Sequence, residues 1–222
     1  MATISEKRDV HDFSEVALQG YGDLIIEQNP DAPESLAIEA DQEIMSRLTS
    51  EVRGGRLILG FDMAWYDWLG WGLEWLFTPN KAIHFRLSMK QVNGVAVSGS
   101  TNLTAGRIQT DALRLVVSGA GKIRIDEIQA QSLSTTISGS GDVEVAAGAV
   151  TQHDLHVSGS GTVRMAGVQT QETRISISGS GNAQVDASKV LDVNISGAGD
   201  VSYKGSPTLT QHISGAATIR QL

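Results

Sequence analysis

The chain has 222 residues, a formal net charge of -8 and no cysteine. The acidic balance argues against nucleic acid or anionic lipid as a partner, because both bind through basic surfaces. The lack of cysteine excludes a disulfide framework and any cysteine-based metal or redox site. No apolar run reaches the length of a membrane-spanning helix. No signal peptide precedes the first strand pattern, so the sequence leaves a cytoplasmic location open.

The residues up to 61 predict short strands and turns with one short helix. Residues 16–26 align with residues 135–145, which belong to a repeat that fills the rest of the chain, and they predict a degenerate first copy of it. Ser35–Glu39 alternates as a strand does, and Asp41 is placed to cap a helix over Gln42–Leu48. Residues 49–61 predict a hairpin.

Residues 62–79 differ in composition from the rest of the chain. They contain all four tryptophans, Trp65, Trp68, Trp71 and Trp75. Most of the apolar side chains would share one face of a helix, which internal glycines weaken by about 1 kcal/mol each. Two interpretations stay open. The rings cover an open end of the fold, where strand edges and core would be exposed, or they form an aromatic patch that binds a protein, a glycan or a membrane interface.

Everything after residue 95 is built on a repeated Ser-Gly phrase. Its serines are 20 residues apart four times and then 18 apart twice: Ser98, Ser118, Ser138, Ser158, Ser178, Ser196 and Ser214. A fixed period of this size indicates a solenoid, in which each repeat forms one coil stacked on the last. Alternating apolar columns on both sides of the phrase predict strands whose inward side chains build the core, down to Gln211 and Ile213 in the last repeat.

The glycines of the phrase, such as Gly119 and Gly121, fall at inward-facing positions. An extended wall that bends towards the core would need a residue without a side chain there, whereas a tight corner would need a positive φ. Both accounts make the glycines structural. The outward columns place opposite charges on neighbouring coils, as in the series Arg124, Glu144 and Arg164, and such ladders favour the correct register.

Chemical motifs are sparse. No Gly-x-Gly copy completes a nucleotide-binding fingerprint, and no nucleophile elbow occurs. Asp142 and Glu144 are the best of the weak catalytic candidates. Carboxylates two residues apart on one strand lie about 7 Å from each other, and glycoside hydrolysis needs such a pair. Their arginine neighbours favour an ordinary solvated face. His153 and His156 would turn to opposite faces of a strand, which argues against a shared metal ion.

Several motifs carry a family resemblance. The runs Ile83–Met89 and Val95–Ser100, the repeated Ile-Ser-Gly-Ser-Gly phrases, and Phe13 followed by Gly20–Asp23 resemble the bacterial family of putative autotransporter adhesins, head GIN domain. The resemblance covers about residues 10–61 and 80–222. It implies a right-handed β-solenoid that is usually exported to the cell envelope, with no established enzymatic activity. The tryptophan segment is not recognised as a family feature.

The sequence therefore predicts an all-β protein with one β-solenoid domain over residues 1–222, a right-handed parallel β-helix with coils of about 20 residues. N-terminal coils with a short helix occupy 10–61, a tryptophan-rich insertion or cap 62–79, and regular coils 80–222. The leading hypothesis is a non-enzymatic structural or adhesive module without cofactor or metal, which binds a protein or glycan. The alternatives are self-assembly into a homo-oligomer and a carbohydrate-active enzyme that uses Asp142 and Glu144.

Overall fold

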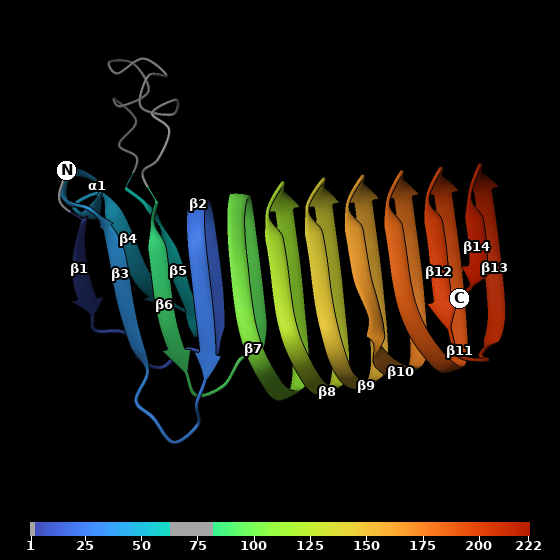
Figure 1. Cartoon of the computed structure of the whole chain (residues 1–222), viewed down its shortest axis with the longest axis horizontal. Coiled ribbons are helices and arrows are strands. Elements are labelled where there is room, and N and C mark those ends of the chain that lie inside the picture. The colour runs from blue at the N-terminus through green and yellow to red at the C-terminus, as the bar shows by residue number, and fades with distance from the viewer. Residues whose placement is uncertain (1–2, 63–81) are drawn as a thin grey trace, which may run out of the picture.

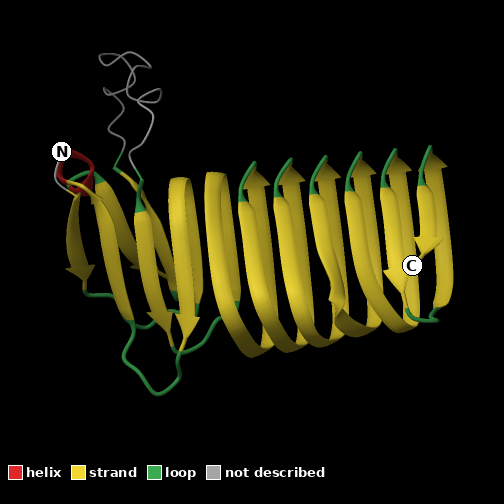
Figure 2. Ribbon diagram, in the orientation of Figure 1, coloured by secondary structure: helices red, strands yellow, loops and turns green. Residues whose placement is uncertain are grey.

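The computed structural model describes residues 3–62 and 82–222, so the four tryptophans lie outside the described residues. Of the described residues, 79% lie in strands and 2% in helices, which confirms the all-β prediction. Figure 1 shows a long row of coils with a more irregular N-terminal end. Figure 2 shows that strands form nearly all of this row. In the described parts of the chain, no helix has the length and apolar character that crossing a bilayer requires.

The regular coils form a parallel solenoid of about 6 turns with coils of about 20 residues, as the period predicts. Each long strand bends and pairs in parallel with the next, so that every column of the repeat is stacked in register; Val117, for example, pairs with Ile137, and Ile137 with Val157. The strands are β7 (Gly94–Gly119), β8 (Lys122–Gly139), β9 (Asp142–Gly159), β10 (Thr162–Gly179), β11 (Asn182–Gly197), β12 (Asp200–Lys204), β13 (Thr208–Gly215) and β14 (Thr218–Gln221).

The N-terminal strands continue the same stack. Strand β2 (Glu15–Gln28) pairs in parallel with β7, and Gly20 lies opposite Gly99, which confirms the degenerate first copy. The next coil outward is shared by β5 (Arg56–Phe61) and β6 (His84–Met89), both parallel to β2. Strand β5 therefore ends, and β6 begins, close to the corner where the other coils carry the Ser-Gly phrase.

Antiparallel strands close this end. Strand β3 (Ser35–Asp41) pairs with β6, and β1 (Thr3–Arg8) pairs with β3. Strand β4 (Leu48–Arg53) pairs with β5 as the predicted hairpin. Because an antiparallel layer cannot continue the parallel winding of the coils, the solenoid ends here in a built cap.

The predicted helix is shorter than expected. Helix α1 spans only Gln42–Met45, and Asp41 occupies the N-cap position without a side-chain hydrogen bond. Leu48, predicted as the last helical residue, instead opens β4 opposite Phe61. The prediction was wrong there because pairing across the hairpin gives Leu48 a buried place, 3% exposed, that a further helical turn would not supply.

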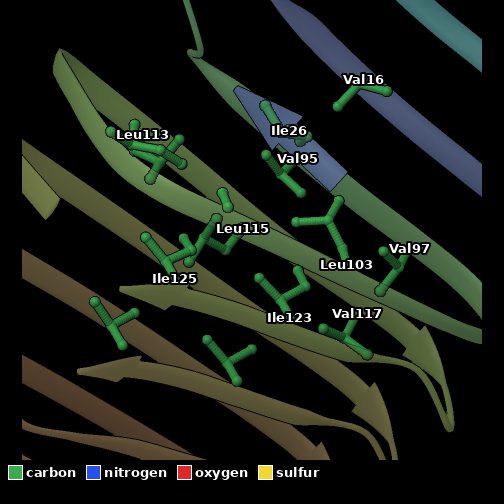
Figure 3. Close-up of a cluster of buried hydrophobic side chains, with 14 of the residues drawn as sticks. Val16, Ile26, Val95, Val97, Leu103, Leu113, Leu115, Val117, Ile123 and Ile125 are labelled. Atoms are coloured by element: carbon green, nitrogen blue, oxygen red, sulfur yellow. The ribbon is translucent and has the colours of Figure 1, made fainter. Parts of the chain in front are cut away.

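The predicted inward columns form the core. Ile123, Ile125 and Val117 are buried, and Figure 3 shows such side chains from successive coils pointing towards one another inside the stack. The prediction fails only at the C-terminal coil, where Gln211 is exposed and Ile213 is 42% exposed. The reason is that β13 pairs with β11 alone, so its inward side chains are covered from one side only.

The two accounts of the corner glycines both hold, each for one glycine of the phrase. Gly139 has a φ of +121°, and an added Cβ would lie 2.6 Å from the Gly119 oxygen of the preceding coil. Gly161 faces inward, where an added Cβ would lie 2.6 Å from Ile137 Cγ2 and 2.8 Å from the Gly141 oxygen. Close stacking of the corners is therefore possible only without side chains.

We expect Gly161→Ala to lower the free energy of unfolding by about 1–3 kcal/mol, because the added methyl overpacks the corner. The matched control is Gly106→Ala, where an added Cβ meets no atom within 4 Å. This variant should be neutral or slightly stabilising, since it only restricts the unfolded chain. Urea unfolding followed by circular dichroism measures both. Equal losses in the two variants would contradict the close-stacking account.

Candidate functional site: a serine-lined groove

A groove of about 650 Å³ runs along the outer wall directly before the glycine corners. Three consecutive positions on each of five neighbouring strands, β8 to β11 and β13, line it, and the middle residue is buried in all of them except β13. We call it the serine groove. Its lining residues are Thr136, Ile137, Ser138, His156, Val157, Ser158, Ser176, Ile177, Ser178, Asn194, Ile195, Ser196, His212, Ile213 and Ser214.

The serines of the Ser-Gly phrase form one side of the groove. Each lies opposite the serine of the next coil, as Ser138 does with Ser158, and all those in the groove are exposed. Their hydroxyls therefore repeat at the strand spacing of about 4.8 Å. None of them makes a hydrogen bond to another described residue. The row thus presents a series of donors and acceptors that are free to bind a ligand.

The opposite side of the groove carries a mixed row of polar side chains. In chain order they are Thr136, His156, Ser176, Asn194 and His212, each in register with the next. No aspartate, glutamate, lysine or arginine lines the groove, although the chain carries a net charge of -8. The charged ladder begins one outward position further back, where Arg174 pairs with Asp154 at 3.7 Å. The groove is therefore a polar strip without carboxylate, lysine or arginine side chains on a protein that is otherwise rich in charge.

The two candidate catalytic carboxylates lie elsewhere, on the wall that follows the corner. Glu144 lies 3.4 Å from Lys122 Nζ and 3.6 Å from Arg124 Nη1, and Asp142 lies 3.9 Å from Arg164 Nη1. The contact between Arg124 and Glu144 confirms one step of the predicted charge ladder, whereas Arg164, which lies opposite Glu144 in the register, is paired with Asp142. Neither carboxylate lines the serine groove. Both carboxylates therefore serve as partners in ion pairs that favour the correct register of neighbouring coils.

The histidine pair divides between the two sides of the wall, as predicted. His153 is 1% exposed, and burial lowers its pKa to about 4. His156 is exposed and lines the serine groove. In the described residues, no group of three or more histidine, cysteine or carboxylate side chains is placed to hold a metal ion.

Sequence reasoning missed the serine groove, although its signal was present. The Ser-Gly phrase was interpreted as structural because its glycines are, yet its serines occupy outward positions in every coil. The proposed aromatic site, Trp65, Trp68, Trp71 and Trp75, lies outside the described residues. On the described side of this segment, Phe61 stacks on Tyr21 with ring centroids 4.7 Å apart, next to the Gly20 corner.

Several solved structures share this fold. A putative adhesin from Bacteroides fragilis NCTC 9343 matches with a TM-score of 0.84 at 22% identity, covering 100% of this chain and 97% of that one. A putative adhesin from Parabacteroides merdae ATCC 43184 matches with a TM-score of 0.75 at 21% identity, covering 99% and 96%. A protein named as a putative lipid binding protein, from Parabacteroides distasonis ATCC 8503, matches with 0.73 at 22%, covering 99% and 96%.

Identities this low show the fold alone, and none of the curated proteins matches the sequence. The family is shown by a different comparison. The model of the family named "Putative auto-transporter adhesin, head GIN domain" matches residues 12–207, which include every regular coil up to β12 and the N-terminal strands from β2 onward. The resemblance carried by the Ser-Gly phrases is thereby confirmed, and the chain belongs to the head GIN domain family of putative auto-transporter adhesins.

Proposed function

We propose that this protein is a non-enzymatic binding module of the bacterial cell envelope that holds an extended, uncharged glycan chain in the serine groove. The observation that carries this proposal is the row of exposed serine hydroxyls, repeated in register along five stacked strands without a charged residue among them. The whole chain, residues 1–222, is proposed to act as one domain.

The chemistry of the groove favours a glycan. Four steps of about 4.8 Å between five coils give a strip roughly 19 Å long, which suits a linear polymer. Hydroxyls, an amide and imidazoles donate and accept hydrogen bonds, as the hydroxyl groups of a sugar do. An anionic polymer would find no cation in the groove to neutralise it. Each hydrogen bond contributes only about 0.5–1.5 kcal/mol, so affinity would come from their number along the chain.

Family and neighbour names support a binding role at the cell surface. The family is named for adhesins, and two of the structural neighbours are named as putative adhesins. The envelope location rests on this family membership. Another neighbour is named for lipid binding. The serine groove offers hydroxyl, amide and imidazole groups along both of its sides, and the proposal assigns these groups to a glycan.

We also propose the tryptophans as a second contact surface. The strand before their segment, β5, ends at Phe61, and the strand after it, β6, begins at His84; both strands lie beside β2, whose Gly20 belongs to the row of corner glycines. A homo-oligomer formed through the same surface is the competing use of these rings.

The groove hydroxyls are tested by Ser158→Val together with Ser178→Val. Losing two hydrogen bonds should weaken the apparent Kd for an immobilised neutral polysaccharide about tenfold. Thr151→Val with Gln171→Val is the control, because both residues are exposed on the same two strands and lie outside the groove. Wild-type protein that binds none of a panel of neutral polysaccharides would refute the proposal, as would equal binding by the two double variants.

Tryptophan emission tests the aromatic surface directly, because all four rings lie in residues 62–79. Exposed rings should emit at long wavelength and be quenched by acrylamide, since water surrounds them. Light scattering of Trp68→Ser with Trp75→Ser beside wild type separates a contact surface from an oligomer interface. Short-wavelength, protected emission would instead assign the rings to a cap.

The enzymatic alternative is tested by Asp142→Asn with Glu144→Gln. We expect wild-type protein to release no reducing ends from the polysaccharide panel, because both carboxylates are held in surface ion pairs. Each substitution should cost less than about 1 kcal/mol of stability, and less still at high salt. Hydrolysis by wild type that disappears in the double variant would overturn the non-enzymatic assignment.

A further inference from the structure

One stretch of the solenoid core is polar, and we call it the polar seam. It consists of four buried residues on three neighbouring strands: Thr135 of β8, His153 of β9, and Thr170 and Thr173 of β10. The stacked position that His153 occupies is leucine in β7, β8 and β11. A column of leucines is therefore interrupted at two consecutive coils, by the titratable ring of His153 in β9 and by Thr173 in β10.

Only one of the two ring nitrogens of His153 has a hydrogen-bond partner among the described residues. Its Nε2 lies 3.2 Å from Thr135 Oγ1, while Nδ1 is buried without a hydrogen-bond partner among the described residues. Beyond β9, Thr170 donates to the Asp186 oxygen at 2.6 Å and lies 2.5 Å from the Thr173 hydroxyl. The polar seam thus has hydrogen bonds on both sides of His153, but no hydrogen bond joins His153 Nδ1 to the threonines of β10.

No countercharge faces the ring inside the core. The inward residues near it on β9 and on the adjoining strands are uncharged: Leu133 and Thr135 from β8, Val150 and Leu155 from β9, Thr170 and Thr173 from β10. Asp154 lies on the outward side of β9 and is paired with Arg174 of β10 at 3.7 Å. A proton on His153 would place a positive charge among hydroxyls and methyl groups, which is costly.

The packing beside His153 is also irregular. Gly148 of β9 stands where the neighbouring coils have Ile108, Ile128 and Val168, so the column loses a large side chain there. The register between β10 and β11 shifts between Thr170 and Glu172. Both departures from the repeat lie within one coil of His153, whereas the pairing of β9 with β8 and with β10 keeps its register throughout.

We infer that β9 is an acid-sensitive break point of the solenoid: proton uptake by His153 opens the polar seam and separates the coils on its two sides. The His153 pKa, which burial lowers from 6.5 to about 4, sets the pH range. The unfolded chain binds the proton below pH 6.5 and the folded chain only near pH 4, so stability falls as the pH falls between these values. The inference requires no ligand. Loss of binding in acid, through the β9 residues of the serine groove, rests in addition on the proposed function.

The test compares wild type with His153→Leu, which restores the leucine of the column. Urea unfolding by circular dichroism at pH 7 and pH 4 should show that the unfolding constant of wild type rises about a hundredfold more than that of the variant. Native-state hydrogen exchange at pH 5 should show faster exchange of β8–β10 amides in wild type than in the variant. Comparing both proteins at one pH removes the intrinsic pH dependence of exchange.

His156→Ser is the matched control, because His156 lies three residues away on the outer face and serine occupies its column in β10. It should keep the acid response of wild type. His153→Asn, a polar side chain that does not titrate, serves as the second variant should leucine prevent folding, and it too should lose the response. The inference is overturned if a folded His153 variant keeps the full acid response, or if His156→Ser removes it.

Discussion

The structure depends on one constraint: every coil must approach the preceding coil closely enough to pair its whole length in parallel register. At the corner this leaves no room for a side chain. The amide of Ser160 donates to the Gly139 oxygen at 2.8 Å, and the same contact repeats from coil to coil. An ordinary residue in place of Gly139 would bring its Cβ to 2.6 Å from the Gly119 oxygen and would need a strained φ. Glycine at the corner is therefore the condition for stacking.

The surface chemistry follows from the same register. Because each residue stands above its equivalent in the next coil, a residue type fixed in the repeat becomes a row on the wall. Ser138, Ser158 and Ser178 thus form a line, whereas scattered serines would form single contacts. The identical geometry places Arg124 beside Glu144 and turns alternating charges into ion pairs. A repeat with small polar residues before its corner produces a linear groove without any dedicated loop.

The stack could be predicted from the sequence because the signals were periodic. The position of Gly20 opposite Gly99, the inward columns and the charge ladder all follow from a count of residues. The helix end at Leu48 could not be predicted, because pairing with Phe61 across the hairpin outweighs local helical pattern. The row of serines could have been predicted, because the alternation of side chains along the strand turns Ser158 and its equivalents outward. The hollow of the groove could not be predicted, because it depends on how the strands bend in three dimensions.

The departures from the repeat determine which coil of the stack is least stable. A perfect repeat would stabilise every interior coil equally, so that opening would begin only at the two ends of the stack. His153 and Gly148 break that equality in β9 by replacing large apolar side chains with a titratable ring and with no side chain at all. The strand that these two residues destabilise also lines the serine groove, because β9 contributes His156 and Ser158 to it. A weak coil inside the groove couples the stability of the stack to the integrity of the surface that the stack creates.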